Sequence, residues 1–262
     1  MHSHGFVPTM GALHEGHLAL IARSLKENQK TTVSIFVNPT QFGPNEDFAK
    51  YPRTLEADVA ACQKLGPVEM FVPTEKEIYP TLESKNHFPY QNDLFKLWEG
   101  KSRPDHFQGV VQVVDRLFQL VKPTQAYFGE KDFQQLTVIK AWVKDKNIPV
   151  KITACPTFRE NDGLAMSSRN RYLNPKERLE AATLYQVLQT ARKLFNEGLT
   201  DWDQVKKTSL QKLSSFFILD YFECVDSADL KAQNKLSAQN RLIIAAKMGT
   251  VRLIDNIGLN HE

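Results

Sequence analysis

The sequence has 262 residues, of which 42% are hydrophobic and 24% charged, as in a globular protein of one or two domains. The formal net charge is only +3 and the basic residues are scattered, which argues against a nucleic-acid-binding surface. No apolar run approaches the roughly 18 residues of a membrane span, and no signal peptide is recognisable. Cys62, Cys155 and Cys224 are widely spaced, which favours free thiols in a reducing compartment.

The first two thirds of the chain alternate between strand and helix patterns. A short strand through Phe6 and Val7 is expected to be broken by Pro8. Further strands are predicted at 31–39, 68–73, 125–129 and 150–156, where apolar and β-branched residues are concentrated. Apolar residues at helical spacing predict helices after residue 17, from the Thr54 cap to Gly66, at 110–121, and around 136–143.

This alternation predicts an α/β domain with a parallel sheet and helices on both faces. Ligands in such domains bind beyond the carboxyl ends of the strands. Four polar segments follow predicted strands and are therefore candidates for the site: PTMGALHEGH, NPTQFGPNED, GEKDFQQ and PTFRENDGLAMSSRN.

The pattern changes after residue 158. Asn174 is expected to cap a long helix that has Pro175 in its first turn and Gly198 after its end, and Thr200 to cap another. Alternating residues at 219–226 predict a half-buried strand, and 241–256 predict a hairpin that turns at 248–250. We therefore expect two domains, residues 1–158 and 159–262, the second a smaller α+β domain.

The segment after the first strand places His14, Gly16 and His17 at the start of a helix. Two histidines three residues apart are compatible with part of a metal site, although such a site needs further ligands. They are also compatible with surface positions at a helix start. A phosphate site accounts for more of the residues, because Gly11 and Gly16 allow close backbone approach and a helix start attracts anions. The segment is not a P-loop.

The other segments carry charged and amide side chains. Lys131 could bind a phosphate and Asp132 a ribose hydroxyl or a metal-bound water, unless GEKD is an ordinary charged turn. Ser167, Ser168 and Arg169 could hold the outer phosphates of a nucleotide, or could form a polar turn. The amides in NPTQF and at 134–135 suit a substrate that bears hydroxyls and a carboxylate, although each alone is more typical of a turn or surface.

These segments together resemble the pantothenate synthetase (pantoate–β-alanine ligase) family. The resemblance rests on VPTMGALHEGHLAL, VSIFVNPTQFGPNEDFAKYPRTLEAD, EGKSRPDHFQGVVQVVDRLF, AYFGEKDFQQL and PTFRENDGLAMSSRNRYL, in the family's order, with a looser RLIDN at 252–256. It implies a Rossmann-like nucleotide-binding domain and a smaller C-terminal lid domain, in a cytoplasmic homodimer.

The resemblance also implies a reaction and its site. ATP, with Mg²⁺, and pantoate would give pantoyl-adenylate and pyrophosphate, and β-alanine would then displace AMP to form pantothenate, a coenzyme A precursor. The implied ATP-binding residues are Met10, Gly11, Ala12, Leu13, His14, Glu15, Gly16, His17, Gly129, Glu130, Lys131, Asp132, Phe158, Met166, Ser167, Ser168 and Arg169. Within that set the implied catalytic residues are His14, His17, Lys131, Ser167, Ser168 and Arg169. Gln41 and Gln135 would bind pantoate, with Gln41 also near β-alanine, and no protein side chain is expected to bind the metal.

The sequence departs from the family pattern in two places. The family usually has a further strand and helix before the GFVPTMG tract, whereas only five residues precede Phe6 here, and this short start is typical of a trimmed beginning. We therefore expect this departure to affect the stability of the sheet edge rather than the site. No functional role is expected for His2 or His4. Phe133 stands where tyrosine is common, so only an aromatic packing role is expected there.

Three alternatives remain open from the sequence. A cytidylyl- or adenylyltransferase acting on a phosphate ester could share the H-x-G-H segment, but it would need more cations and would not need the glutamines. A nucleic-acid-binding domain is disfavoured by the low net charge. A zinc enzyme would require His14 and His17 to be joined by further ligands.

Overall fold

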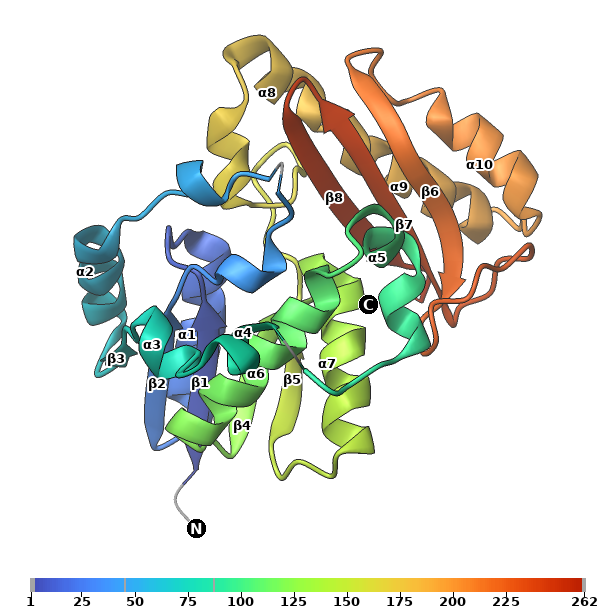
Figure 1. Cartoon of the computed structure of the whole chain (residues 1–262). Helices are drawn as coiled ribbons and strands as arrows, with labels where there is room; N and C mark the ends of the chain where they lie inside the picture. Colours follow the sequence, from blue (N-terminus) through green and yellow to red (C-terminus); the bar gives the residue numbers. More distant parts are fainter. Residues whose placement is uncertain (1–2, 45, 87, 261–262) are drawn as a thin grey trace. The chain divides into compact units, whose positions relative to one another are not determined.

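The computed structural model describes residues 3–44, 46–86 and 88–260, and it divides the chain into two units (Figure 1). The first unit is Met1–Glu130 with Gln134–Pro156, and the second is Lys131–Phe133 with Thr157–Glu262. Within the described residues, the first unit has a parallel sheet in the order β3-β2-β1-β4-β5. Its strands are β1 (His4–Thr9), β2 (Lys30–Ile35), β3 (Glu69–Phe71), β4 (Gln125–Gly129) and β5 (Lys151–Cys155). The predicted α/β class is confirmed.

Helices cover both faces of this sheet because neighbouring residues of β1 point to opposite sides. Val7 packs in a cluster with Ile21 of α1 (Glu15–Glu27) and Cys62 of α2 (Leu55–Leu65). Phe6 instead meets the ring of Phe118 on α6 (His106–Val121), which in turn lies against Trp142 of α7 (Phe133–Asp145). The sheet is therefore doubly wound, as expected of a Rossmann-like domain.

The strand order fixes where a ligand can bind. β1 lies at the centre of the sheet, between β2 and β4. From β1 the chain continues to β2 and β3 on one side, and it then crosses over to β4 and β5 on the other side of β1. The crevice at such a reversal, beyond the carboxyl ends of the strands, is the usual ligand site of this fold. The segments that follow β1, β2 and β4 all begin at this edge.

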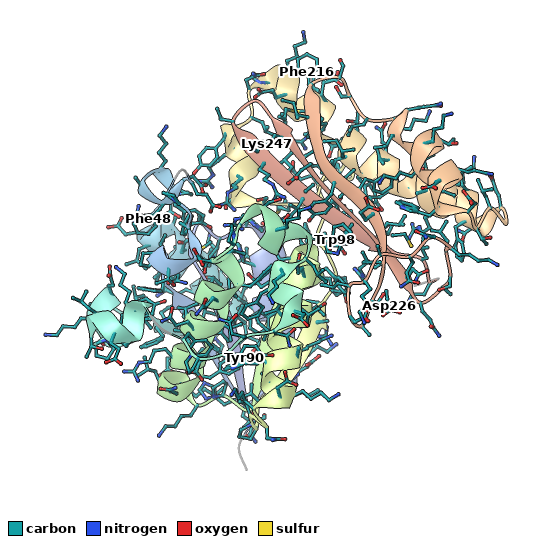
Figure 2. The ribbon with its side chains drawn as sticks, turned by 45° about the vertical axis from the view of Figure 1, so that its right-hand side comes forward. Phe48, Tyr90, Trp98, Phe216, Asp226 and Lys247 are labelled. Atoms are coloured by element: carbon teal, nitrogen blue, oxygen red, sulfur yellow. The ribbon has the colours of Figure 1, made fainter. Side chains whose placement is uncertain are left out.

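The second unit contains an antiparallel sheet of β6 (Phe217–Asp226), β7 (Asn240–Met248) and β8 (Val251–Gly258) within its described residues. Figure 2 marks β6 by Phe216, just before its start, and by Asp226 at its end. Lys247 of β7, also labelled there, pairs with Ile218. Its helices are α8 (Pro175–Ala181), α9 (Thr183–Asn196) and α10 (Trp202–Leu210). Apolar side chains of α9, α10 and the sheet form one core, as expected for an α+β domain.

Several element boundaries differ from the prediction. Pro8 does not break β1. The pairing of β1 with β4 covers Gly5 and Phe6 and ends there, so at Pro8 the strand is paired with β2 on one side only. Proline, which lacks an N–H, is tolerated where one side of a strand is unpaired. The strand predicted at 31–39 ends at Ile35. The helix predicted after Asn174 divides at Ala182, where Thr183 Oγ1 donates a hydrogen bond to the Glu180 carbonyl and competes with the helical bonds.

Three further features were not expected from the sequence. Asp201, rather than Thr200, caps α10, because its side chain accepts from the Gln204 amide. Short helices α3 (Glu75–Ile78), α4 (Leu82–Asn86) and α5 (Trp98–Ser102) lie in a region for which no element was predicted. Of the polar beginning, Met1 and His2 lie outside the described residues, whereas His4 begins β1.

Candidate active site

The loop after β1 has an unusual backbone. Gly11 has a φ of 81° and Ala12 a φ of 50°, a left-handed conformation that is costly for alanine. The carboxylate of Asp58 on α2 stabilises this loop: Oδ2 accepts from the Ala12 amide at 3.0 Å and Oδ1 from the Leu13 amide at 2.8 Å. Asp58 is 3% exposed and also accepts from Thr54 Oγ1 at 3.2 Å. These two amides are therefore engaged by the protein itself.

His14 and His17 meet at the start of α1. His14 is the N-cap and His17 the third helical residue, and their ring centroids lie 4.0 Å apart. The His14 backbone amide donates to Nδ1 of His17 at 3.3 Å. A neutral His17 must then carry its proton on Nε2, so that Nε2–H is the donor end of the ring. Both imidazoles thus lie where the helix start favours a bound anion.

The metal-site interpretation finds no further ligands among the residues that the structure describes. In residues 3–44, 46–86 and 88–260, no group of three or more histidine, cysteine, aspartate or glutamate side chains is placed to hold a metal ion.

The turn after β2 presents Gln41. Asn38, which is 1% exposed, accepts from the Tyr79 hydroxyl at 2.6 Å and donates to the Gly109 carbonyl at 3.1 Å. The same Asn38 Nδ2 donates to Gln41 Oε1 at 3.1 Å. This bond engages the oxygen of the Gln41 amide, so its nitrogen is the end that can donate to a substrate carboxylate or hydroxyl.

Two residues near the start of α6 hold the Gln41 backbone. His106 Nδ1 lies 2.9 Å from the Gln41 carbonyl oxygen, and Arg103 Nη2 donates to the same oxygen at 3.3 Å. Arg103 also makes a bidentate ion pair with Glu46, with both distances 2.6 Å. Burial, and then the Arg103 charge, lower the pKa of His106 from 6.5 to about 4. His106 is therefore neutral near pH 7, and its Nδ1–H donates to the carbonyl.

The end of β4 leads to Gly129 and Glu130, both partly exposed. Gln135 follows on the first turn of α7 and is partly exposed, as a substrate-binding residue requires. Its neighbour Gln134 has a structural role: it is buried, accepts from the Glu99 amide at 3.0 Å, and donates to the carbonyls of Leu94 and Leu97.

The remaining predicted residues belong to the second unit. Lys131 Nζ lies 3.3 Å from Asp132 Oδ1, and the lysine side chain is 22% exposed. Phe158 is 42% exposed, and its carbonyl accepts from the Met166 amide at 3.0 Å. Ser167 caps a short 3₁₀ helix, Ser168–Tyr172, and accepts from the Arg169 amide at 3.3 Å. Ser167, Ser168 and Arg169 are thus part of one ordered turn.

Sequence reasoning missed the residues that hold the site segments in place. Asp58 lies four residues before Cys62, and both are buried on one face of α2. An acidic residue on the apolar face of a helix was the available signal. His106 and Arg103 lie in a quoted segment, EGKSRPDHFQG, but no local pattern marks them as partners of Gln41. The hydrogen bonds that join Asp255 and Asn256, the last two residues of RLIDN, to Arg159 and to the Lys131 carbonyl were missed as well.

Comparison with known proteins places these features in one family. The sequence model described as pantoate-beta-alanine ligase matches residues 1–258. A pantothenate synthetase of Sulfurihydrogenibium is 48% identical over 97% of this chain and 91% of its own length. The chain spans about half, 49%, of the bifunctional pantoate ligase/cytidylate kinase of Synechococcus elongatus, to which it is 47% identical over 97% of its own length.

Solved structures agree with the sequence comparison. The pantothenate synthetase of Thermus thermophilus has a TM-score of 0.94 and 44% identity, covering 99% of this chain and 94% of that one. A pantoate-beta-alanine ligase from Francisella tularensis, complexed with β-γ ATP and β-alanine, has a TM-score of 0.80 and 38% identity, covering 100% and 91%. The five-stranded parallel sheet, the three-stranded sheet and the H-x-G-H helix start thus occur in a chain that belongs to the pantoate–β-alanine ligase family.

Proposed function

We propose that the protein condenses pantoate with β-alanine to form pantothenate, using ATP and releasing AMP and pyrophosphate through a pantoyl-adenylate. The observation that carries this proposal is the similarity over the whole chain to the Francisella ligase that was solved with ATP and β-alanine. The helix start with His14 and His17, at the carboxyl edge of the sheet, supports it as a nucleotide phosphate site.

The first half-reaction needs alignment and charge stabilisation. The pantoate carboxylate is ionised at neutral pH and requires no base to become a nucleophile. Gln41 and Gln135 hold pantoate so that a carboxylate oxygen attacks the α-phosphorus of ATP. The bond from that phosphorus to the bridging oxygen breaks, and pyrophosphate leaves with both electrons.

Donors aimed at the developing charge lower the barrier for this step. In our proposal His17 donates through Nε2–H, because its Nδ1 is engaged by the His14 amide. His14, Lys131, Ser167, Ser168 and Arg169 are the other donors to the phosphates. Met10–His17, Gly129–Asp132, Phe158 and Met166–Arg169 form the ATP-binding set. Since Asp58 occupies the Ala12 and Leu13 amides, this loop would contribute its shape and its helix start rather than those two donors.

In the second half-reaction the amine of β-alanine attacks the acyl carbon, and AMP departs with the bridging oxygen. The amine must be neutral to attack. We propose that it loses its proton to water or to the AMP phosphate, because no side chain of the predicted site is assigned as a dedicated base. An ionisation in the pH–rate profile that disappears in one side-chain variant would contradict this. The C-terminal domain, acting as a lid, keeps water from the mixed anhydride.

Three further properties remain predictions. Mg²⁺ enters with ATP as part of the substrate, and the protein forms a homodimer. The cytoplasmic location is supported by three cysteines that are free and buried. None of the helices in the described part of the chain is long and apolar enough to cross a membrane.

The proposal is tested by mixing the protein with ATP, Mg²⁺ and pantoate, without β-alanine, and analysing the bound and released products by mass spectrometry. We expect pantoyl-adenylate and pyrophosphate, and pantothenate with AMP once β-alanine is added. His17→Ala should slow adenylate formation by about two to three orders of magnitude, as for loss of one well-placed donor. ADP and inorganic phosphate, or AMP formation that does not require pantoate, would contradict the proposal.

A further inference from the structure

The C-terminal segment Arg252–Asn256 has no part in the reaction described above. It lies on β8, and its last two residues, Asp255 and Asn256, are polar but only 3% and 4% exposed. Burying such groups is costly unless they are hydrogen-bonded, so their partners indicate what they do. The two side chains contact different segments of the predicted phosphate site, and the Asn256 carbonyl also accepts from Arg159 at 3.3 Å.

Asn256 contacts the segment that carries Lys131. Its Nδ2 donates to the Lys131 backbone carbonyl at 2.9 Å, across 125 residues of sequence. Arg241 of β7 donates to Asn256 Oδ1, which fixes the orientation of the amide. The Arg241 guanidinium also lies 4.0 Å from the centroid of the Phe133 ring. The turn 131–133 is therefore held from both ends, and an aromatic ring at 133 is enough for the second contact.

Asp255 contacts the segment that leads to Ser167, Ser168 and Arg169. Both of its oxygens accept from Arg159, at 2.7 and 3.0 Å. Arg159 also donates to the carbonyl of Gly163 at 3.0 Å and stacks 3.7 Å from the Tyr185 ring centroid. The backbone of Arg159 also pairs with that of Ala165, directly before Met166, in an isolated antiparallel β-bridge. Asp255 thus fixes the loop on which the serines and arginine are carried.

The division of the chain into two units agrees with these contacts. Lys131–Phe133 belongs to the second unit, although Glu130 before it and Gln134 after it belong to the first. The lysine therefore shares a unit with β8 and with the serine–arginine loop rather than with the strand that precedes it.

We propose that Asp255 and Asn256 are positioning residues that hold Lys131 and the Ser167–Arg169 turn in one frame, so that both reach the same triphosphate together. This rests on the proposed function, because it assumes that both segments bind ATP. Neither residue needs to touch the nucleotide. Loss of the Asn256 bond leaves the Lys131 backbone less constrained, which weakens the alignment of ATP but leaves the pantoate residues on the other unit unchanged.

The test compares Asn256→Ala with Asn240→Ala. Asn240 is a matched control: it is a buried asparagine of the same sheet, 4% exposed, whose amide oxygen accepts from the Ser237 amide and hydroxyl. Steady-state kinetics for each substrate and the melting temperature are measured for both variants. Hydrogen exchange of the peptide spanning 131–133 is measured by mass spectrometry.

We expect Asn256→Ala to lower kcat/KM for ATP about tenfold, equivalent to about 1.4 kcal/mol, with the KM values for pantoate and β-alanine nearly unchanged. Exchange at 131–133 should be faster. Asn240→Ala should lower the melting temperature to a similar extent and change neither ATP kinetics nor exchange at 131–133. If Asn256→Ala does not fold, Arg241→Gln, which removes the group that orients the amide, should give the same pattern in weaker form.

Two outcomes would overturn the inference. One is equal ATP kinetics in the Asn256 and Asn240 variants, and the other is an equal rise in KM for all three substrates. Failure of the proposed function is distinguishable: the unmodified protein would then show no pantoate-dependent release of pyrophosphate. In that case unchanged exchange at 131–133 in Asn256→Ala would still overturn the positioning role.

Discussion

At the residue scale, the loop after β1 depends on one carboxylate. Asp58 binds two successive amides of a loop that contains a left-handed alanine, and it does so from another element 46 residues away. Hydrogen bonds that involve a charged partner contribute about 1.5–3 kcal/mol each. Asp58 therefore offsets the backbone strain at Ala12 and sets the direction in which α1, with its two histidines, begins.

Replacing Asp58 tests this dependence. Asp58→Asn keeps one accepting oxygen but turns an NH₂ group toward a backbone N–H, so we expect the free energy of unfolding to fall by about 2–4 kcal/mol. The kcat/KM for ATP should fall at least tenfold. Thr54→Val is the control, since it removes only the hydroxyl bond to the same carboxylate, and it should cost less than about 1 kcal/mol. Equal effects in the two variants, measured by urea unfolding and kinetics, would contradict this role of Asp58.

His106 predicts a pH dependence of stability. Its pKa is about 4 in the folded protein and 6.5 as the ordinary value, so the unfolded chain binds the additional proton between these pH values. The contribution of neutral His106 to the free energy of unfolding is therefore fully present above pH 6.5, and it is lost as the pH falls toward 4. Between pH 7 and pH 5 this amounts to about 2 kcal/mol. His106→Asn keeps a donor near the Gln41 carbonyl and should lose about 2 kcal/mol less over that range in urea titrations. Parallel pH profiles in the two proteins would show that His106 does not titrate this way.

At the scale of elements, α6 and the turn that carries Gln41 are in direct contact. A Cβ atom built on Gly109 would lie 2.4 Å from the Thr40 carbonyl oxygen and 2.8 Å from the Gln41 nitrogen. These are backbone atoms, which cannot move aside as the end of a side chain can. The glycine therefore lets the helix approach the turn, while Asn38 joins the two by its bond to the Gly109 carbonyl.

Gly109→Ala separates helix propensity from this close approach. Inside a helix, alanine is normally more favourable than glycine by about 1 kcal/mol, and Gly109 is the fourth residue of α6. Here we expect the opposite: a loss of about 1–3 kcal/mol in unfolding free energy and a clear rise in KM for pantoate, because the Gln41 turn is displaced. The KM for ATP should change less. A variant that is more stable than the unmodified protein, with unchanged KM for pantoate, would contradict the close approach.

The elements were predictable where the signal was local. The apolar stripe of 110–121 and the runs that became β4 and β5 follow from spacing alone, and the Asn174 cap follows from residue type. The division at Ala182 could not be predicted, because a threonine side chain competes there with helical bonds of similar strength. Pro8 was misjudged because tolerance of proline depends on which neighbouring strand pairs with that residue.

Candidate residues for the site could be named from the sequence by the same local signals. Residue type and position after a strand identified His14, His17, Gln41 and Lys131 as candidates. The groups that hold them, Asp58 and Asn256 among them, are separated from their partners by 46 and 125 residues. Only the packed chain brings such pairs together, so local patterns do not reveal them. The roles of the candidates in binding and catalysis remain predictions.

At the scale of the whole molecule, the residues proposed to bind the substrates are distributed over the two units. The first carries the histidines and the glutamines, and the second carries Lys131 and the Ser167–Arg169 turn. In the proposed reaction, both units thus supply donors to the phosphates, whereas the glutamines that bind pantoate belong to the first unit alone. The central claim is that the carboxylate of pantoate becomes bonded to the α-phosphorus of ATP.

Pantoate labelled with heavy oxygen in its carboxylate tests that claim most directly. With ATP, Mg²⁺, β-alanine and the protein, mass spectrometry of the products should find one heavy oxygen in AMP and the other in the amide of pantothenate. The bridging oxygen stays on phosphorus when the amine attacks the acyl carbon, so this distribution follows from the adenylate. Heavy oxygen in inorganic phosphate, or AMP that carries none, would contradict the account.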